Sequence, residues 1–457
     1  MKKKFLLSFL VFFLVGCEEK VPPPEPFSGE LTIWTAVSPD FFEALGKEFM
    51  AALDETEGKI RVIPFRDDAE LQETFVHTLA RGEGPDVIVS DTDFIFQKKD
   101  LFVPFRTSES LEAEYLVKNF LSFSLKGLLF GDTMLGVPIG IDTLGLISNT
   151  EQVQTPPNTW EAFRVIVSEL TEPDNSFQRF SRSGAAIGRV DNVWRGKEVL
   201  ENILFQMAGK MFSEDGREAF FTQKQGVTSK GQRVNFTQEA FRFFLDFAIP
   251  GSGQTSWNEF LSAASSESKE WRPFLEGRVS MIFGNAGDVE ALLLRAKNDP
   301  NALLSPEHIS VSSFPQFHSE EVSSPRRVVS RVVALAVPHE ATHPSLAWRF
   351  LTFAIRPDTL RAFYRETKLA SPRSELLLEQ KADPVFGIFA EQASYAEPLL
   401  LPVARNFFRE KIADLVEKVL SQKYLLPDGL IRLEQEFTQK LKRNLEIQQQ
   451  IEKRSPE

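Results

Sequence analysis

The sequence predicts an α/β fold in which a mainly parallel sheet carries helices on both faces. Two observations near the start of the chain support this prediction. β-rich runs at 30–37, 59–65 and 85–91 alternate with two segments, 41–53 and 68–83, whose apolar residues recur at helical spacing. Strand and helix alternate in this way in parallel sheets, because each helix returns the chain to the end of the sheet where the next strand begins.

These first elements place polar residues at one edge of the predicted sheet. The strand "ELTIWTAV" carries Trp34 near its end, and "PDVIVSD" leads into Asp91 and Asp93. Asp68 stands where it would cap the second helix. Ligands of parallel sheets bind beyond the carboxyl ends of the strands, so this edge is the predicted ligand side.

The remainder of the chain continues with helices and buried strands. Helical spacing predicts helices in "PPNTWEAFRVIVSEL", "VDNVWRGKEVLENILFQMAG", "HPSLAWRFLTFAI" and "LPDGLIRLEQEFTQKLKRNLE". "RVSMIFGNAGD" predicts a strand that runs into a glycine turn, and the β-branched run "RVVSRVVALAVP" is typical of a buried strand. No internal repeat is present, and at about 150 residues per domain the length favours two or three domains.

The chain begins with the pattern of a secretory signal peptide over residues 1–16. Lysines at positions 2 to 4 precede the apolar run "FLLSFLVFFLVG", which is too short for a bilayer span of roughly 20 residues. "LVGC", which ends in Cys17, resembles a bacterial lipobox and implies cleavage before Cys17 and diacylation of its sulfur. An ordinary cleaved signal with a chance cysteine is the alternative.

Cys17 is the only cysteine, so the mature chain has no internal disulfide. Residues 17–28 hold the anchor and a proline-rich tether of about 30 Å, at about 3 Å per residue. We therefore expect an exported protein, lipid-anchored at the outer face of the cytoplasmic membrane or in the periplasm.

The composition of the chain is acidic and rich in phenylalanine. Its formal net charge is −12, and removal of residues 1–16, which hold three lysines and no acid, leaves −15. This charge argues against nucleic acid as a partner. The 42 phenylalanines predict large cores, whereas only four tyrosines and six tryptophans argue against an aromatic sugar-binding cleft.

No catalytic or metal-binding motif stands out. The nucleophile elbow G-x-S-x-G, the phosphate loop G-x-x-x-x-G-K-[ST] and the zinc motif H-E-x-x-H do not occur. His339 and His343 have helical spacing, but Pro338 and Pro344 disfavour a shared helical face. The sequence therefore predicts no metal, no cofactor and no enzyme, although two converging carboxylates for glycoside cleavage stay open.

Eight segments, in order, resemble bacterial extracellular solute-binding proteins of the sugar type, the family that includes maltose-binding protein. They are "TIWTAV", "GPDVIVSDTDF", "DLFVPF", "GVPIGIDTLGLISNTEQV", "PPNTWEAF", "FLEGRVSMIFGNAGDVEAL", "SSFPQ" and the long segment 334–376. The resemblance covers roughly residues 30–445. It implies two α/β lobes, each a mainly parallel sheet flanked by helices, with a cleft and hinges between them, in a protein that serves an ABC importer.

The resemblance also implies where the lobes begin and end. Lobe 1 would hold residues 29–138 and 330–369, and lobe 2 residues 139–329 and 370–446, followed by a disordered tail at 447–457. The three expected crossings between the lobes lie near Pro138–Thr143, Arg326–Arg331 and Lys368–Ser371.

By position, the resemblance places ten residues at the cleft. Trp34, Asp91 and Asp93 follow strands of lobe 1. Asp142 lies on the first crossing, where a carboxylate would accept hydrogen bonds from hydroxyl groups. The other expected contacts are Asn192, Trp194, Gln206, Met207, Gly284 and Asn285. The alternatives are structural roles: a core tryptophan, helix caps at the aspartates and an ordinary helix face at 206–207.

The sequence departs from the family pattern in two places. "NGSWD" is common after the strand that ends at Gly284, with a tryptophan that stacks on the ligand, but this chain has "GNAGD" with Gly287 in that place. A sugar ring would lose a contact of about 1 kcal/mol there. "YAEPLLLP" replaces a common "PRP" pattern and puts Glu397 in place of a base.

Together these observations predict a monomeric binding lipoprotein. It would capture a small solute, a mono- or oligosaccharide, by hinge closure and deliver it to an ABC import permease. The alternative is a surface lipoprotein of the same fold that acts as a sensor or scaffold without transport. A cell-surface glycan hydrolase ranks third, because no catalytic constellation is visible in the sequence.

Overall fold

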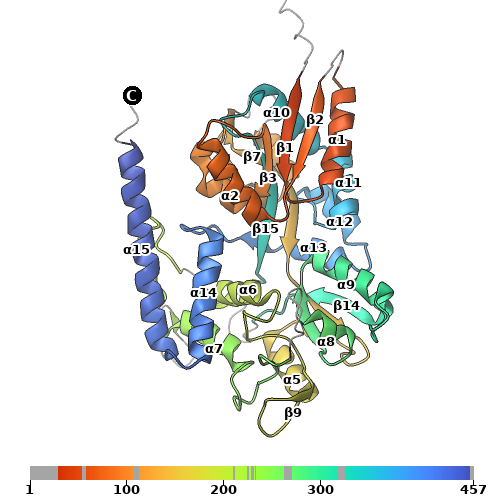
Figure 1. Cartoon of the computed structure of the whole chain (residues 1–457), viewed down its shortest axis with the longest axis vertical. Helices are drawn as coiled ribbons and strands as arrows, with labels where there is room; N and C mark the ends of the chain where they lie inside the picture. Colours follow the sequence, from red (N-terminus) through yellow and green to blue (C-terminus); the bar gives the residue numbers. More distant parts are fainter. Residues whose placement is uncertain are drawn as a thin grey trace, which may run out of the picture.

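Two sheets organise the chain, one in each of two lobes (Figure 1). The computed structural model describes residues 29–53, 58–106, 113–208, 211–223, 226–227, 231, 233–261, 270–317 and 325–452. The expected signal peptide, the anchor Cys17 and the tether lie outside the described residues. Of the helices in the described ranges, none is long and apolar enough to cross a membrane.

The sheet of the first lobe has six strands in the order β16-β15-β3-β1-β2, with β7 also paired to β15. They are β1 (Glu30–Thr35), β2 (Lys59–Pro64), β3 (Val87–Asp91), β7 (Gly136–Thr143), β15 (Val328–Ala336) and β16 (Ala396–Pro398). β1 is parallel to β2 and β3, as predicted, whereas β15 runs antiparallel to β3 and β7. The first-lobe sheet is therefore mixed, with the predicted parallel strands at one side.

Helices cover both faces of this sheet because side chains alternate along its strands. The helices packed here are α1 (Pro39–Ala51), α2 (Asp68–Leu79), α3 (Thr92–Gln97), α4 (Ala113–Asn119), α10 (Pro344–Ala354) and α11 (Pro357–Thr367). Leu31 and Ile33 of β1 enter a core shared with α1, α10 and α11. Trp34 enters the core on the opposite face, shared with α2 and α3.

The sheet of the second lobe corrects the expectation of mainly parallel strands. β8 (Gly145–Asn149) lies between β13 (Met281–Gly284) and β14 (Ile309–Ser313), and both neighbours run antiparallel to it. β13, α9 (Ala286–Asn298) and β14 do form a strand–helix–strand unit whose two strands point the same way. The difference arises because β8, which follows directly from β7 of the first sheet, lies between these two strands in the opposite direction.

Helices make up most of the second lobe. The remaining helices are α5 (Trp160–Leu170), α6 (Gly196–Met207), α7 (Phe236–Asp246), α8 (Trp271–Leu275), α12 (Ser374–Gln380), α13 (Gly387–Gln392), α14 (Arg405–Leu420) and α15 (Leu426–Glu452). Two short strand pairs accompany these helices: β9 (Glu172–Pro173) with β10 (Phe180–Arg182), and β11 (Gly226–Val227) with β12 (Arg233–Val234). A separate small sheet, formed by residues before β7, holds β4 (Phe105–Arg106), β5 (Leu129–Phe130) and β6 (Thr133–Met134). α6, α7, α14 and α15 pack together at one side of this lobe (Figure 1).

The last helix is longer than expected. α15 continues to Glu452, so the expectation of a disordered tail from 447 is wrong for residues 447–452. The stretch from Leu445 to Glu452 contains only Leu, Ile, Glu and Gln. No proline or glycine interrupts the helix there, and each added residue contributes one more backbone hydrogen bond. Residues 453–457 lie outside the described part of the chain.

Two adjacent strands, β7 and β15, pass from one lobe into the other, and we call the pair the connecting ribbon. Val137 of β7 and Leu335 of β15 belong to the core of the first lobe. Further along the same strands, Ile141 and Val332 belong to the core of the second lobe. A third segment joins the ribbon where Ala370 pairs with Ile141. The two cores are therefore linked by three neighbouring stretches of chain.

The connecting ribbon contains a β-bulge at its middle. Val333 pairs with Gly140, but the next residue, Ala334, pairs with Pro138, so Ile139 is an extra residue on β7. A bulge bends the strand that carries it and increases the local twist. The bulge lies where the strands leave the core of the first lobe for that of the second.

Candidate functional site

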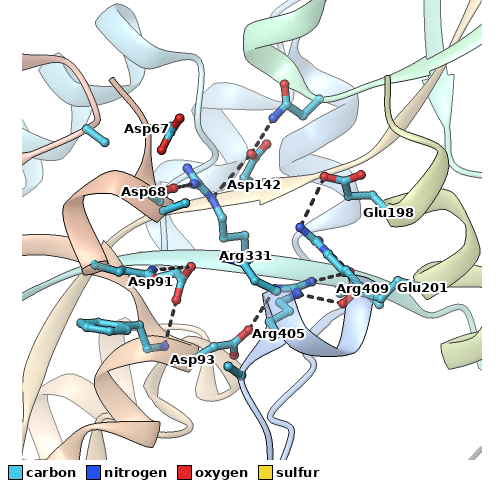
Figure 2. Close-up of a pocket in the computed structure, with 18 of the residues that line it drawn as sticks. Asp67, Asp68, Asp91, Asp93, Asp142, Glu198, Glu201, Arg331, Arg405 and Arg409 are labelled. Atoms are coloured by element: carbon cyan, nitrogen blue, oxygen red, sulfur yellow. Dashed lines mark hydrogen bonds and ion pairs between the residues drawn. The ribbon is translucent and has the colours of Figure 1, made fainter. Parts of the chain in front are cut away.

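A cavity of about 760 Å³ lies between the two lobes (Figure 2). Its lining includes Ala36 and Val37, which follow β1, and Asp91, the last residue of β3. α6 and the start of α14 line it from the second lobe, and the connecting ribbon contributes Asp142 and Arg331. The cavity therefore lies beyond the carboxyl ends of two parallel strands, at the edge that the sequence predicts for a ligand.

Charged side chains dominate the cavity wall. Among the described residues that line it, eight carry carboxyl groups and six are basic, while Phe94 alone is aromatic. The acids are Asp67, Asp68, Glu73, Asp91, Asp93, Asp142, Glu198 and Glu201, and the bases are Arg66, Lys98, Arg195, Arg331, Arg405 and Arg409. Such a wall recognises a ligand by hydrogen bonds and charge rather than by ring stacking.

Arg405, the first residue of α14, joins the two lobes (Figure 2). Its Nε and Nη2 donate to the two carboxylate oxygens of Glu201 on α6, at 2.9 and 3.0 Å, and its Nη1 donates to Asp93 Oδ2 on α3 at 3.0 Å. Arg409, one helical turn further on, donates to Glu201 at 2.7 Å and to Glu198 at 3.3 Å. Because residues four apart share a helix face, α14 presents both guanidinium groups to α6.

The two carboxyl groups that share Arg405 have opposite pKa shifts. Glu201 is fully buried, and burial alone would raise its pKa, but the charges of Arg405 and Arg409 outweigh burial and lower the pKa to about 2. Burial raises the pKa of Asp93 to about 7, because the single hydrogen bond from Arg405 offsets only part of the loss of hydration. Arg405 therefore neutralises mainly Glu201, with which it forms two hydrogen bonds.

A second group of charges surrounds Arg331 on the connecting ribbon (Figure 2). Its Nη1 donates to Asp68 Oδ2, and its Nε lies 3.9 Å from Asp142 Oδ2. Asp142 Oδ2 also accepts a hydrogen bond from Asn285 Nδ2, at 2.8 Å. Burial alone would lower the pKa of Arg331, but Asp68, Asp142 and Asp91 together raise it. One guanidinium group is thus surrounded by three carboxyl groups.

Asp68 is available to Arg331 because it does not cap a helix, contrary to the sequence prediction. The cap of α2 is Asp67, whose Oδ1 accepts a hydrogen bond from the backbone N–H of Glu70 at 2.9 Å. Asp67 has the extended backbone of a capping residue, with φ −154°. Asp68 is therefore the first helical residue, and its side chain reaches the cavity.

Asp142 has an unused acceptor inside the cavity wall. The residue is only 8% exposed, and its Oδ1 accepts no hydrogen bond from the described part of the chain. Burial raises the pKa of Asp142, although Arg331 and Arg195 oppose this shift. A buried carboxylate oxygen without a donor is unfavourable, so this atom would gain from a donor on a bound ligand.

Four of the residues that the sequence predicts for the site line the cavity, namely Asp91, Asp93, Asp142 and Asn285. They come from β3, α3, β7 and the N-cap of α9, and the fold brings them together from both lobes. Asp91 also caps α3, because its Oδ1 accepts a hydrogen bond from the N–H of Phe94 at 2.9 Å. For Asp91 the site prediction and its structural alternative are therefore compatible.

The other six predicted residues, Trp34, Asn192, Trp194, Gln206, Met207 and Gly284, do not line the cavity. Trp34 is buried with its ring centroid 5.1 Å from that of Phe65, as the structural alternative predicts. Trp194 is 49% exposed, and its Nε1 donates to Asp288 Oδ1 at 3.1 Å. Met207 packs beside the core of the second lobe, and Gly284 ends β13.

Gln206 and Asn192 bind buried indole groups instead of facing the cavity. Gln206 Oε1 accepts a hydrogen bond from Trp160 Nε1 at 2.9 Å, and its amide nitrogen donates to two backbone carbonyls. Asn192 Oδ1 accepts from Trp257 Nε1 at 3.0 Å. A buried indole N–H needs an acceptor, so these two side chains stabilise the second lobe.

Sequence reasoning missed the arginines of the cavity and their acidic partners. Arg405 and Arg409 are four apart, and Glu198 and Glu201 are three apart, so each pair shares a helix face. A signal was present in Glu201, which with Asn202 interrupts the otherwise apolar stretch 199–205 of α6. A single sequence does not say which helix carries the partner, so the pairing could not be derived.

The described residues hold no group of three His, Cys, Asp or Glu side chains suited to a metal ion. The arrangement instead offers many hydrogen-bond donors and acceptors in a cavity between two lobes. This geometry suits reversible binding of a small polar molecule.

Comparisons with known proteins identify the family. Residues 44–386 match the family described as bacterial extracellular solute-binding protein. The maltotriose-binding protein of Pyrococcus abyssi (strain GE5 / Orsay) is 20% identical over 377 residues, which cover 81% of this chain and 72% of that protein.

Two solved structures have the same two-lobe fold. A cyclo/maltodextrin-binding protein complexed with maltotetraose is 16% identical, with a TM-score of 0.69 over 92% of this chain and 99% of that chain. The maltotriose binding protein of Thermus thermophilus, bound with maltotriose, is 15% identical, with a TM-score of 0.62 over 90% of this chain and 100% of that chain. Together with the family match, which spans well over half of the sequence, they lead to one conclusion: the chain belongs to the bacterial extracellular solute-binding proteins.

Proposed function

We propose that this chain is an exported, lipid-anchored protein that captures a small polar solute, a mono- or oligosaccharide, and delivers it to an ABC import permease. The observation that carries the proposal is the cavity between the lobes, which residues of both lobes line. Its volume of about 760 Å³ lies within the range of small-molecule sites, roughly 300–1,000 Å³.

The names of the relatives support a saccharide as the solute. They are binding proteins of maltotriose and of cyclo/maltodextrin. The carboxylates of this cavity accept hydrogen bonds from hydroxyl groups, and its guanidinium groups donate to hydroxyl and ring oxygens. Because Phe94 is the one aromatic side chain among the described lining residues, a sugar would be held by polar contacts on nearly all sides.

Capture would proceed by closure of the lobes about the connecting ribbon. A solute that touches Asp91 on one side and Asn285 or Glu198 on the other makes all its contacts only when the lobes are close together. It therefore binds the closed state more tightly than an open one and shifts the population toward closure.

A thermal-shift screen of mono- to tetrasaccharides with α and β linkages tests the ligand class. A ligand that binds only the folded protein stabilises it by about 2.7 kcal/mol at 100 times its Kd. For a sugar that raises the melting temperature, X-ray scattering should report a smaller radius of gyration with the sugar than without it. A panel in which no sugar changes the melting temperature would contradict the saccharide proposal, and tight binding without compaction would contradict closure.

Uptake of the labelled sugar separates transport from the alternative role as a sensor or scaffold. Cells that lack this protein should lose high-affinity uptake of the sugar that the purified protein binds. Uptake that persists in these cells, despite tight binding by the purified protein, would favour the sensor or scaffold.

A further inference from the structure

The arginines of the cavity are already paired with carboxyl groups of the protein. Arg405 and Arg409 share Glu201, as described above. Arg195 donates from Nε and Nη2 to the two oxygens of Asp288, at 2.6 and 2.9 Å. These three guanidinium groups are therefore paired with carboxyl groups of the protein, Arg405 in both lobes, and leave little charge for an anionic solute.

The same holds on the side of the first lobe. Arg66 lies 2.9 Å from Asp67 Oδ2, and Arg331 donates to Asp68. Lys98 is exposed at the edge of the cavity and forms no ion pair with the described residues. Among the described basic residues of the cavity, Lys98 is therefore the one without an ion pair, and it faces solvent.

Two carboxyl groups, in contrast, lack a close basic partner. Asp91 Oδ1 caps α3, and its Oδ2 has only Gln72 Nε2 at 3.4 Å, with no ion pair to the described residues. Asp142 lies 3.9 Å from Arg331 at one oxygen, while its Oδ1 accepts no hydrogen bond in the described part of the chain. Negative charge and acceptor capacity therefore remain in the cavity.

The carboxyl groups of Asp91, Asp142 and Asp68 lie around the guanidinium group of Arg331. Figure 2 shows the Arg331 guanidinium between Asp68 and Asp142, with Asp91 below it, and we call the three carboxyl groups the acidic triad. All three raise the pKa of Arg331 against the effect of burial, as charges in close proximity do. Arg331 thus lies among the three carboxyl groups, while Arg195 and Arg405 act electrostatically on Asp142 and Asp91, respectively.

Closure of the lobes makes this excess charge unfavourable. Expulsion of water from the cavity removes the hydration that offsets an unpaired carboxylate. A neutral hydroxyl group donates a hydrogen bond but leaves the charge in place, whereas a cationic nitrogen supplies both the donor and the opposite charge. Burial already raises the pKa of Asp142 and of Asp68, so the basic groups of the protein compensate these carboxylates incompletely.

We propose that the solute carries a basic nitrogen, an amino group or guanidinium on a small polar frame, and that its positive charge binds at the acidic triad of Asp68, Asp91 and Asp142. Arg331 already places one positive charge among these three carboxyl groups. The inference rests on the proposed function, because it takes the cavity between the lobes as the solute site.

Calorimetry with ring-matched sugars tests the charge preference near neutral pH, where the amino group is mostly protonated. The first set is glucose, glucosamine, N-acetylglucosamine and glucose 6-phosphate. The second set is cellobiose, chitobiose and N,N′-diacetylchitobiose, and spermidine and free arginine serve as cations without a sugar ring. The amine should bind roughly 10- to 100-fold more tightly than its hydroxyl and acetamide counterparts. This preference should shrink as the salt concentration rises.

Two variants test whether the acidic triad causes the preference for the amine. Asp91→Asn and Asp142→Asn should each remove most of the preference for the amine and leave weak binding of the neutral sugar. Asparagine is also a good helix cap, so Asp91→Asn preserves the start of α3 and keeps the test valid even if Asp142→Asn folds poorly. Glu43→Gln is the control, because Glu43 is an exposed acid on α1 outside the cavity lining. It should leave the preference unchanged.

The outcomes separate this inference from the proposed function. A neutral or phosphorylated sugar that binds as tightly as the amine overturns the inference and leaves the saccharide proposal intact. An amine preference that survives in both asparagine variants also overturns it. Spermidine or arginine bound in the absence of any sugar binding supports the cationic solute and overturns the saccharide. If none of these compounds binds, the inference is overturned, and the thermal-shift screen of mono- to tetrasaccharides decides the saccharide proposal separately.

Discussion

Replacing Asp93 by asparagine should stabilise the folded protein above neutral pH. Asp93 is 5% exposed, and burial raises its pKa from 3.8 to about 7. Between these two pH values the folded carboxyl group keeps a proton that the unfolded chain has lost. Its contribution to stability is therefore fully present below pH 3.8 and is lost as the pH rises through about 7. Asparagine has no proton to lose, so the variant avoids this loss.

The size of the effect follows from the pKa shift and the contacts of Asp93. About three pKa units at about 1.4 kcal/mol each give an upper limit of about 4 kcal/mol at pH 8 and above. The pKa shift already includes the attraction of Arg405, but an asparagine amide replaces the protonated carboxyl group imperfectly, so a gain of about 2 kcal/mol is expected. With an unfolding entropy of about 2 cal/mol/K per residue, this corresponds to a rise of about 2 °C in Tm.

Urea unfolding between about pH 4 and pH 9 measures the effect in the wild type, Asp93→Asn and Glu43→Gln. The free energies of unfolding of the first two proteins should agree at low pH and separate as the pH rises, with the variant more stable. Glu43→Gln should follow the wild type throughout. An Asp93→Asn protein that is less stable than the wild type at pH 8 would refute the reasoning, because it would mean that the ionised carboxylate gains more from Arg405 than burial costs.

The remaining predictions concern the site and the anchor. Asp142→Ala should weaken binding of the identified solute about 10- to 150-fold by calorimetry, since a charge-assisted hydrogen bond is worth roughly 1.5–3 kcal/mol. An affinity within threefold of the wild type, together with a lowered Tm, would assign Asp142 a structural role. Arg405→Met should lower the free energy of unfolding by about 3–5 kcal/mol in urea, because it removes a partner of the buried carboxylate of Glu201. Arg361→Met, on a surface ion pair, should change it little. Cys17→Ser should release the protein from the membrane fraction, and a variant that still incorporates labelled palmitate would exclude the lipobox interpretation.

Local pattern was enough to predict part of the fold and part of the site. Asp91 was placed at the ligand side because the β-rich run before it is short, apolar and preceded by a helix, and all of this information lies within a few residues. The same reasoning predicted β1, β2 and β3 as parallel strands. The structure confirms these strands and their direction.

Long-range pairing could not be predicted in the same way. Glu201 and Arg405 are 204 positions apart, and nothing near either residue says that α6 meets α14. The antiparallel second sheet has a similar cause, because the direction of β8 depends on the strand pair between which it lies. Gln206 on α6 and Asn192 in the loop before α6 bind buried indoles rather than facing the cavity, and the local sequence does not distinguish these two environments.

The bulge in the connecting ribbon has a mechanical consequence. β7 and β15 are hydrogen-bonded to each other on both sides of Ile139, so neither strand can rotate without the other. The two strands therefore twist together, and the extra residue influences the preferred twist of the pair and its resistance to twisting. In the proposed closure, a change at Ile139 or Gly140, which do not line the cavity, would shift the angle between the lobes and thereby the apparent affinity. A binding-competent state that is populated less often binds more weakly. In the proposed closure, affinity would thus depend partly on the elasticity of two strands.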